Sequence, residues 1–271
     1  MHNILKIAGY QHCFGVFLRI FCLFLNQLEE AIWTHIYTTF GQFLTHDLGE
    51  TGVSVVAAGC SCSSTDANCL PIKMPTGDTV MKSDCITFTR SSATLPLDCA
   101  SSQREQLNLV TAYIDGSQVY GSSASSSSHL RTFNGGELIT STGLLAGRDY
   151  LPTTAQVCSA AGSEKCFESG DHRTTENLGL SGLHTLFLRE HNRLARELAK
   201  VNPAWNDETL FQETRRIVVA ILQHITYNQY VPGTIGLQNL DAYQIRPNTG
   251  VNSVATYFTG YNSSVSGKKV I

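Results

Sequence analysis

Residues 31–48, with the sequence AIWTHIYTTFGQFLTHDL, decide the fold, because their apolar side chains recur at steps of three and four. This spacing predicts a helix with one apolar face. The apolar face is made of Trp33, Ile36, Tyr37, Phe40, Phe43 and Leu44. A second row at the same spacing is polar but uncharged, and is made of His35, Thr39, Gln42 and His46. Such a row is unusual for a helix face that meets only water.

Two further helices are predicted between residues 178 and 230. In the first, the apolar side chains from Leu183 to Leu198 keep one face, and Asn202-Pro203 ends the helix. The second helix is expected to take Asn206 as its N-cap and to end at Pro232-Gly233.

The rest of the chain predicts loops and short elements. Residues 49–103 are rich in Gly, Ser and Cys and are expected to be irregular. Residues 104–120 are expected to begin as a helix that ends at Gly116, and the serine-rich residues 122–128 to form a loop. Turns and short extended pieces are expected over residues 130–170. The predicted fold class is therefore mainly α, with long cross-linked loops.

The composition narrows the classes of function. The chain has 271 residues, of which 42% are hydrophobic, and its formal net charge is −3. It is long enough for one large or two ordinary domains and apolar enough for a sizeable core, which excludes extended disorder. The charge gives no basic footprint for nucleic acid, so the function has to come from particular residues.

Nine cysteines indicate covalent cross-links. Six of them fall in two groups: Cys60, Cys62, Cys69 and Cys85, then Cys158 and Cys166. The first group contains no C-x-x-C pair and no histidine, so disulfides are favoured over a zinc site. Disulfides imply an oxidising compartment. The odd total leaves at least one free or intermolecular thiol.

The first 25 residues carry two apolar runs, 13–18 and 20–25, separated by Arg19. A membrane-spanning helix needs ~20 largely apolar residues, and a central charge is unfavourable by about 2.5–3.5 kcal/mol. As a signal peptide, the segment is interrupted and lacks a small-residue cleavage site. No transmembrane span is expected, and residues 1–30 are interpreted as an amphipathic or misassigned terminus.

Gln42 and His46 are four positions apart, so both side chains can line one cavity. A histidine beside an amide can accept and return a proton near neutral pH. The alternative is a core histidine whose hydrogen bonds are satisfied. Asp47 points about 100° away around the helix axis and needs a partner of its own.

Oxygen-bearing side chains that alternate along residues 111–117 offer that partner. They are Thr111, Tyr113, Asp115 and Ser117. Alternation puts their oxygens on one side of an extended chain, and Ca²⁺ takes 6–8 oxygen ligands. With Asp47 the set would complete a calcium site, whereas the alternative is a loop with Asx and ST turns.

A third stretch, residues 170–177, has the sequence GDHRTTEN and places Arg173 and Glu176 three residues apart. Taken alone, the two residues are equally explained as an exposed ion pair, which contributes only ~0–1 kcal/mol to stability. Three more motifs occur in order with it: GQFLTHD (41–47), REQLN and DGSQVYG (104–121), and LHTLFLREHNRLA (183–195). Together the four motifs strongly resemble the animal haem peroxidases, from about residue 34 to about residue 265.

The resemblance implies a role for each matching residue. His46 is expected to take a proton from H₂O₂ and deliver it to the departing oxygen, with Gln42 as the amide that orders the peroxide. Arg173 is expected to stabilise the O–O bond as it polarises, and Glu176 to form an ester with a haem methyl. The implied cofactors are haem b and Ca²⁺. The implied partners are H₂O₂ and a small electron donor, a halide or a phenol.

The same resemblance implies the ion site and the cross-links. The calcium ligands would be Asp47, Thr111, Tyr113, Asp115 and Ser117. The disulfides would be Cys60–Cys69, Cys62–Cys85 and Cys158–Cys166. The expected location is extracellular or in the secretory pathway.

Departures from the family pattern bear on the haem. Thr45 stands where several members have an aspartate that forms a second haem ester, and Asn177 stands where one member has a methionine bonded to the haem. At most one covalent haem link is therefore expected.

The proximal histidine of the family is expected shortly beyond residue 265 and is not found up to Ile271, so residues 31–271 are interpreted as the distal half of a haem peroxidase domain. His224 is interpreted as structural.

The expected function is that of a haem peroxidase, which reduces H₂O₂ and oxidises a halide or a phenolic or organic donor. The rival is a non-catalytic, calcium-binding extracellular scaffold with a peroxidase-like fold. A hydrolase built on His46 and Asp47 is disfavoured, because neighbouring helix residues diverge and no nucleophile is indicated. Haem titration discriminates between the first two, since a scaffold stays colourless and still gains stability from Ca²⁺.

Overall fold

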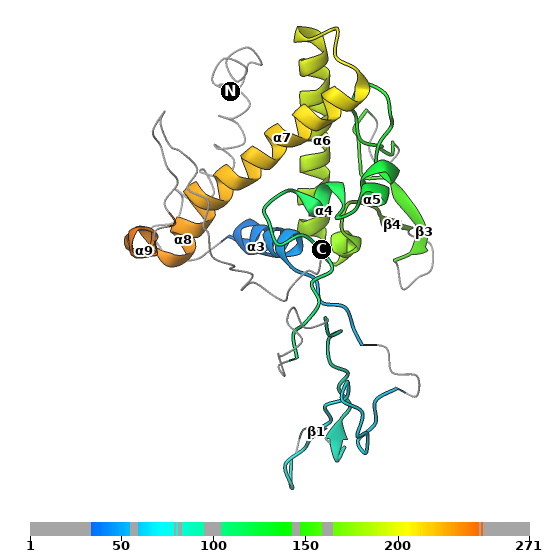
Figure 1. The fold of residues 1–271 in the computed structure, drawn as a ribbon, viewed down its shortest axis with the longest axis vertical. Coiled ribbons are helices and arrows are strands. Elements are labelled where there is room, and N and C mark those ends of the chain that lie inside the picture. The colour runs from blue at the N-terminus through cyan, green and yellow to red at the C-terminus, as the bar shows by residue number, and fades with distance from the viewer. Residues whose placement is uncertain are drawn as a thin grey trace. The chain divides into compact units, whose positions relative to one another are not determined.

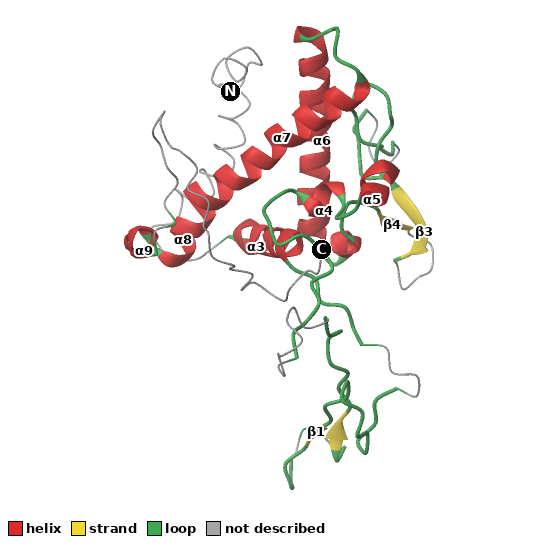
Figure 2. Ribbon diagram, viewed as in Figure 1, coloured by secondary structure: helices red, strands yellow, loops and turns green. Residues whose placement is uncertain are grey.

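The computed structural model describes residues 34–54, 59–78, 80, 83–94, 104–142, 147–158, 165–243 and 245. These residues fall into two compact units, one with the residues up to Asp47 and from Ile114 onward, and one with Leu48–Tyr113. Helices dominate the first unit and loops the second (Figures 1 and 2), so the mainly α fold class is confirmed. The predictions for residues 1–30 and for the chain beyond residue 265 lie outside the described residues. None of the helices described is long and apolar enough to cross a membrane.

The first unit is built on three long helices: α3 (His35–Leu48), α6 (Leu178–Val201) and α7 (Asp207–Ile225). The last two pack against each other and are joined by residues 202–206 (Figure 1). Phe43 of α3 stacks on Phe187 of α6 with ring centroids 5.1 Å apart, and both rings are buried. The predicted N-cap is confirmed, because the side chain of Asn206 accepts a hydrogen bond from the backbone of Thr209.

Shorter elements complete this unit. They are α4 (Ser117–Tyr120), α5 (Ala124–His129), β3 (Thr153–Val157), β4 (Lys165–Phe167), the 3₁₀-helix η1 (His172–Thr175), the π-helix η2 (Thr226–Tyr230), α8 (Val231–Ile235) and α9 (Leu237–Ala242). The strands β3 and β4 pair antiparallel, with Thr153 opposite Phe167, and agree with the extended pieces predicted for residues 130–170.

The helical start predicted for residues 104–116 is wrong. Gln106 and Asn108 form isolated bridges to Ala93 and Thr51, and the side chain of Asn108 also bonds the backbone of Glu50 and Leu48. These long-range bonds take the place of a helical ladder. Residues 112–115 bend instead of running extended. The helix α4 begins only after Gly116, whose φ of 74° lies in the left-handed region that favours glycine.

Two further local predictions are wrong. The serine-rich stretch contains helix α5, because the hydroxyl of Ser123 accepts from the backbone of Ser126 and caps it. The pair Pro232-Gly233 does not end the helical run that starts at α7. The chain passes through η2 into α8, and Pro232 lies in the first turn of α8, where a missing N–H is tolerated.

The second unit is held by cross-links around a small ladder. The strand β1 (Ile72–Lys73) pairs antiparallel with β2 (Cys85–Ile86). Disulfides join Cys60 to Cys69 and Cys62 to Cys85, with Cα atoms 5.5 and 6.0 Å apart. Among the residues of this unit that are described, the buried apolar side chains are Cys69 and Val110. With the Cys158–Cys166 bond in the first unit, all three predicted pairings are confirmed.

Candidate active site

Helix α3 presents Gln42 and His46 one turn apart, as the sequence predicts. His46 is 5% exposed and Asp47 is fully buried. Thr45 lies between Gln42 and His46 in the chain. Its hydroxyl donates to the backbone oxygen of Gly41 at 2.8 Å and is therefore engaged within its own helix.

Arg173 is presented by the short helix η1, and Asp171 caps that helix. Oδ1 of Asp171 accepts from the backbone N–H of Arg173 at 2.8 Å. The same carboxylate also accepts two bonds from the guanidinium, Nε to Oδ1 at 2.9 Å and Nη2 to Oδ2 at 2.6 Å. Two such parallel, charge-assisted bonds fix the plane and direction of a guanidinium.

The loop that bears Arg173 meets the end of α3. Nη2 of Arg173 donates to the backbone oxygen of His46 at 3.3 Å, and Oδ1 of Asp171 lies 3.8 Å from Nδ1 of His46. The second distance is too long for a hydrogen bond but short for a charge beside an imidazole. The predicted imidazole and guanidinium, 127 residues apart in the chain, therefore come together around one buried carboxylate.

The other predicted residues lie on the Nε2 side of His46. Oε2 of Glu176 is 3.8 Å from Nε2 of His46 and accepts from Nε2 of Gln42 at 2.7 Å. Nδ2 of Asn177 donates to Oε1 of Gln42 at 2.8 Å. Because the side chain of Glu176 is 48% exposed, this side of the imidazole is more open than the Nδ1 side, where the ring nitrogen is buried without a hydrogen bond among the described residues.

Burial and charge set the protonation of the two central groups. Burial, and then the nearby guanidinium of Arg173, lower the pKa of His46, and the carboxylates of Asp171 and Glu176 only partly oppose this. Burial works against ionisation of Asp171, but the hydrogen bonds from Arg173 outweigh it and hold the pKa of that carboxyl below its usual value. At neutral pH the imidazole is therefore neutral and the carboxylate is charged.

Part of the predicted calcium set is also brought together. The buried carboxylate of Asp47 accepts from the backbone of Ser117 at 2.6 Å, from its hydroxyl at 2.7 Å, and from the backbone of Gly116 at 3.1 Å. Burial raises the pKa of Asp47 to about 6, with a smaller contribution from Asp115 and opposition from the Ser117 bonds. Among the described residues, no group of three or more His, Cys, Asp and Glu side chains is arranged to hold a metal ion, so an ion here would depend on hydroxyl and carbonyl oxygens as well.

Thr111 and Tyr113, the other two predicted ligands, belong to the second unit. There the hydroxyl of Thr111 donates to the backbone oxygen of Tyr113 at 3.4 Å. Their part in an ion site stays a prediction.

The sequence reasoning missed three residues that shape the site. Asp171 holds Arg173, and Asn177 both caps α6 and bonds Gln42. His184 is fully buried on α6. Its Nδ1 lies 2.9 Å from the hydroxyl of Ser169, which begins the segment 169–176 that carries Arg173, called the arginine loop below. A usable signal existed for Asn177, because asparagine is a preferred N-cap and directly precedes the helical stretch predicted from residue 178. Asp171 caps η1, a helix that the sequence analysis does not predict. No local pattern marks His184.

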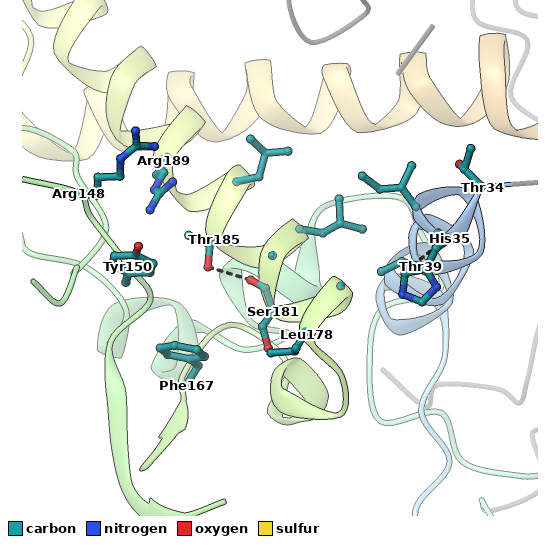
Figure 3. A pocket seen from close by; sticks show the side chains of 15 residues that line it. Thr34, His35, Thr39, Arg148, Tyr150, Phe167, Leu178, Ser181, Thr185 and Arg189 are labelled. Carbon is teal, nitrogen blue, oxygen red and sulfur yellow. Dashed lines mark hydrogen bonds between the residues drawn. The ribbon is translucent and has the colours of Figure 1, made fainter. Parts of the chain in front are cut away.

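The cavity in Figure 3 lies apart from these residues. Its volume is about 830 Å³, and none of Gln42, His46, Arg173 and Glu176 lines it. The start of α3 forms one end with Thr34, His35 and Thr39, the first turns of α6 form the wall, and Arg148, Tyr150 and Arg189 lie at the other end (Figure 3). On α3, His46 therefore lies in the last turn, whereas the cavity is lined by His35 and Thr39 from the first turns.

Comparisons with known proteins agree with the motifs. A family model described as animal haem peroxidase matches residues 23–269. Chorion peroxidase from Drosophila melanogaster is 38% identical over 264 residues, which cover 84% of this chain and 32% of the relative. A peroxidasin homolog from Homo sapiens is 37% identical over 241 residues, covering 78% of this chain and 16% of the relative.

A solved structure gives the same answer. Peroxidase A from Dictyostelium discoideum superposes with a TM-score of 0.60 at 28% identity, covering 85% of this chain and 43% of that one. The chain spans less than a third of the length of the chorion peroxidase and of the peroxidasin homolog. Because the family model covers nearly the whole sequence and the fold agrees, the chain belongs to the animal haem peroxidase family.

Proposed function

We propose that this chain provides the peroxide-handling side of a haem peroxidase, which reduces H₂O₂ and oxidises a small donor such as a halide or a phenol. One observation carries the proposal: the imidazole of His46 and the guanidinium of Arg173, from distant segments, meet around Asp171 with Gln42 and Glu176 on the open side. Membership of the peroxidase family supports it.

The donors at this place fit one face of a haem. Glu176 offers a half-exposed carboxylate beside Nε2 of His46, which suits an ester to a haem methyl. Thr45 offers a hydroxyl that is bonded to Gly41 and no carboxylate, so at most one covalent link forms on this side. When bound, haem b supplies the redox-active iron at which peroxide is reduced and a donor is oxidised.

His46 acts as the proton carrier in this proposal. Its neutral state at pH 7, caused by burial and by Arg173, leaves a lone pair for the proton of H₂O₂. Nε2 faces the open side beside Gln42 and Glu176, so this nitrogen takes the proton from one peroxide oxygen and returns it to the other, which departs as water. The amide of Gln42 orders the peroxide beside it.

Arg173 supplies fixed positive charge. Its guanidinium cannot lose its proton at physiological pH, so it stabilises the negative charge that develops on the departing oxygen. Its bonds to Asp171 and to the backbone oxygen of His46 keep this charge next to the imidazole. Such preorganised charge is often the largest contribution to an enzymatic rate.

We also propose that Asp47, Asp115 and Ser117 of the first unit contribute oxygen ligands to a Ca²⁺ ion beside the catalytic helix, while the part of Thr111 and Tyr113 stays a prediction. The buried carboxylate of Asp47, whose pKa is raised to about 6 by burial, is the donor that supports this proposal. The hydroxyl of Ser117 would turn a lone pair to the ion. Bound there, the ion would fix Asp47, which directly follows His46 on α3.

The three disulfides support placement in an oxidising compartment. We propose that the chain acts in the extracellular space or the secretory pathway.

Haem titration of the full oxidised chain with Ca²⁺ present tests the proposal. We expect a Soret band and peroxide-dependent oxidation of a phenolic dye. His46→Ala and Arg173→Ala should each slow peroxide consumption by about 10²–10³-fold, the usual contribution of an acid–base group or a charged stabiliser. His224→Ala removes an exposed imidazole on α7 and serves as the matched control, with unchanged turnover.

Two results would contradict the proposal. In one, the haem-loaded chain consumes peroxide and His46→Ala consumes it equally fast. In the other, the chain stays colourless with haem but gains thermal stability from Ca²⁺, which is the behaviour of a non-catalytic scaffold.

A further inference from the structure

We propose that Asp171 is the positioning residue for Arg173: its carboxylate holds the guanidinium at the end of α3, where His46 lies. This inference rests on the proposed function and adds a residue that does not itself touch the peroxide. It predicts that Arg173 loses its defined direction when Asp171 loses its charge, while the fold persists.

The contacts of Asp171 are concentrated on one partner. Three donors of Arg173, the backbone N–H, Nε and Nη2, converge on its two oxygens at 2.6–2.9 Å. The side chain of Asp171 is 2% exposed and that of Arg173 is 17% exposed, so little water competes for these bonds. The pair therefore has one arrangement in place of the many that a solvated arginine samples.

The carboxylate is fixed by its loop. The hydroxyl of Thr174 donates to the backbone oxygen of Asp171 at 2.6 Å, and Ser181 of α6 donates to the backbone oxygen of Thr174 at 2.8 Å. On the other side of the loop, Gly170 lies so close to α4 that a Cβ would overlap the backbone of Ser117 and Gly121. Asp171 is thus held from α4 and from α6, and the guanidinium is held by Asp171.

Two other acceptors lie near Arg173, and neither matches this carboxylate. The backbone oxygen of His46 accepts from Nη2 at 3.3 Å, a longer bond to a neutral group. Glu176 is half exposed and already accepts from Gln42. Asp171 also faces Nδ1 of His46 at 3.8 Å, so one carboxylate stands beside both groups of the proposed chemistry.

The test follows the Nε–H signal of Arg173 by NMR in the full, oxidised, ¹⁵N-labelled chain without haem. Arg173→Lys, which has no Nε–H, identifies the signal. In the parent chain this hydrogen should exchange slowly with solvent. In Asp171→Asn, whose amide oxygen can still cap η1, and in Asp171→Ala, we expect exchange at least about tenfold faster, as when one charge-assisted hydrogen bond is lost.

Asp207→Asn is the matched control, because Asp207 pairs with Arg131 through Nη2 and Oδ2 at 2.8 Å far along the chain from Arg173. It should leave the Arg173 signal unchanged. If Asp171→Ala does not fold, Asp171→Asn alone decides. A folded Asp171→Asn chain with the parental Arg173 signal and exchange rate would overturn the proposal.

Peroxide consumption of the haem-loaded variants separates this inference from the proposed function. If Arg173→Ala leaves peroxide consumption unchanged while Asp171→Asn speeds the solvent exchange of the Arg173 Nε–H, the positioning role stands and the proposed function fails. If Arg173→Ala slows consumption and Asp171→Asn changes neither the signal nor the rate, the function stands and the positioning role fails. We expect both variants to slow peroxide consumption, and we expect Asp171→Asn also to speed the solvent exchange of the Arg173 Nε–H.

Discussion

At the scale of single residues, the missing side chain of Gly170 lets the arginine loop lie against α4. A Cβ at this position would overlap backbone atoms of Ser117, Tyr120 and Gly121, which cannot move without shifting a helix that is also bonded to Asp47. Gly182, an exposed glycine in α6, offers the opposite case, because a Cβ there meets nothing within 4 Å.

Gly170→Ala should therefore destabilise the chain by about 2 kcal/mol or more, since rigid backbone has to move to admit the methyl group. Gly182→Ala should stabilise it by about 0.5–1 kcal/mol, the gain of alanine over glycine within a helix. Urea unfolding measures both. Equal effects of the two substitutions would show that the close approach at Gly170 does not exist.

The buried imidazole of His191 makes stability depend on pH. Its Nε2 lies 2.9 Å from the backbone oxygen of Gly136 and its Nδ1 lies 2.8 Å from the hydroxyl of Tyr120. Because a carbonyl only accepts, Nε2 carries the proton and Nδ1 accepts from tyrosine. Burial lowers the pKa of His191 to about 4, so the folded chain keeps it neutral.

The sign of the effect follows from proton uptake. Between pH 6.5 and pH 4 the unfolded chain binds a proton at His191 that the folded chain does not, so stability falls as the pH falls through this range. The loss is roughly 2 kcal/mol by pH 5. Urea unfolding at pH 7.5 and pH 5.0 should show a smaller difference for His191→Asn than for the parent. Equal differences would mean that His191 titrates normally in the fold.

At the scale of elements, Asn177 links the start of α6 to α3. Its side-chain oxygen accepts from the backbone of Leu180 at 2.8 Å, and its side-chain nitrogen donates to Gln42 at 2.8 Å. One residue thus caps a helix of 24 residues and orients an amide of the candidate site.

The two roles of Asn177 can be separated by substitution. Asn177→Ala should lower the free energy of unfolding by about 1 kcal/mol, because the cap is lost. Asn177→Ser should stay near the parent in stability, since serine also caps, and yet both variants should shift the side-chain amide signal of Gln42 in an NMR spectrum. A Gln42 signal that moves only in the alanine variant would contradict the direct bond.

The elements also show what a sequence can predict. The helices α3, α6 and α7 are predictable because their apolar side chains repeat over many turns, and the cap at Asn206 is a local signal. The structure of residues 104–116 is not, because Asn108 bonds backbone that lies 58 and 60 residues away. Asp171 escapes notice for the same reason: its cap is local, but its place beside His46 depends on how α3 packs. The disulfide pairings came from the family resemblance and not from spacing.

At the scale of the whole molecule, the two units differ in what stabilises them. The first contains the packed rings of Phe43, Phe187, Tyr120 and Phe211, whereas the described part of the second buries little apolar surface and carries two disulfides. A disulfide restricts the unfolded chain and typically contributes ~2–4 kcal/mol.

Replacing Cys62 and Cys85 together by serine should therefore loosen the second unit and leave the first intact. Hydrogen exchange should rise over residues 59–94 and stay unchanged in α6 and α7. The matched control is the serine replacement of Cys158 and Cys166, which should act in the first unit only. Faster exchange in α6 after loss of Cys62–Cys85 would show that the units depend on each other.

The joint action of His46 and Arg173 on peroxide is the central claim, and a double-mutant cycle tests it most directly. The rate constant for peroxide consumption is measured for the haem-loaded parent, His46→Ala, Arg173→Ala and the double variant. If both residues serve one step, the double variant should lose little more than the more damaged single variant. Losses that multiply, or a single variant as fast as the parent, would contradict the claim.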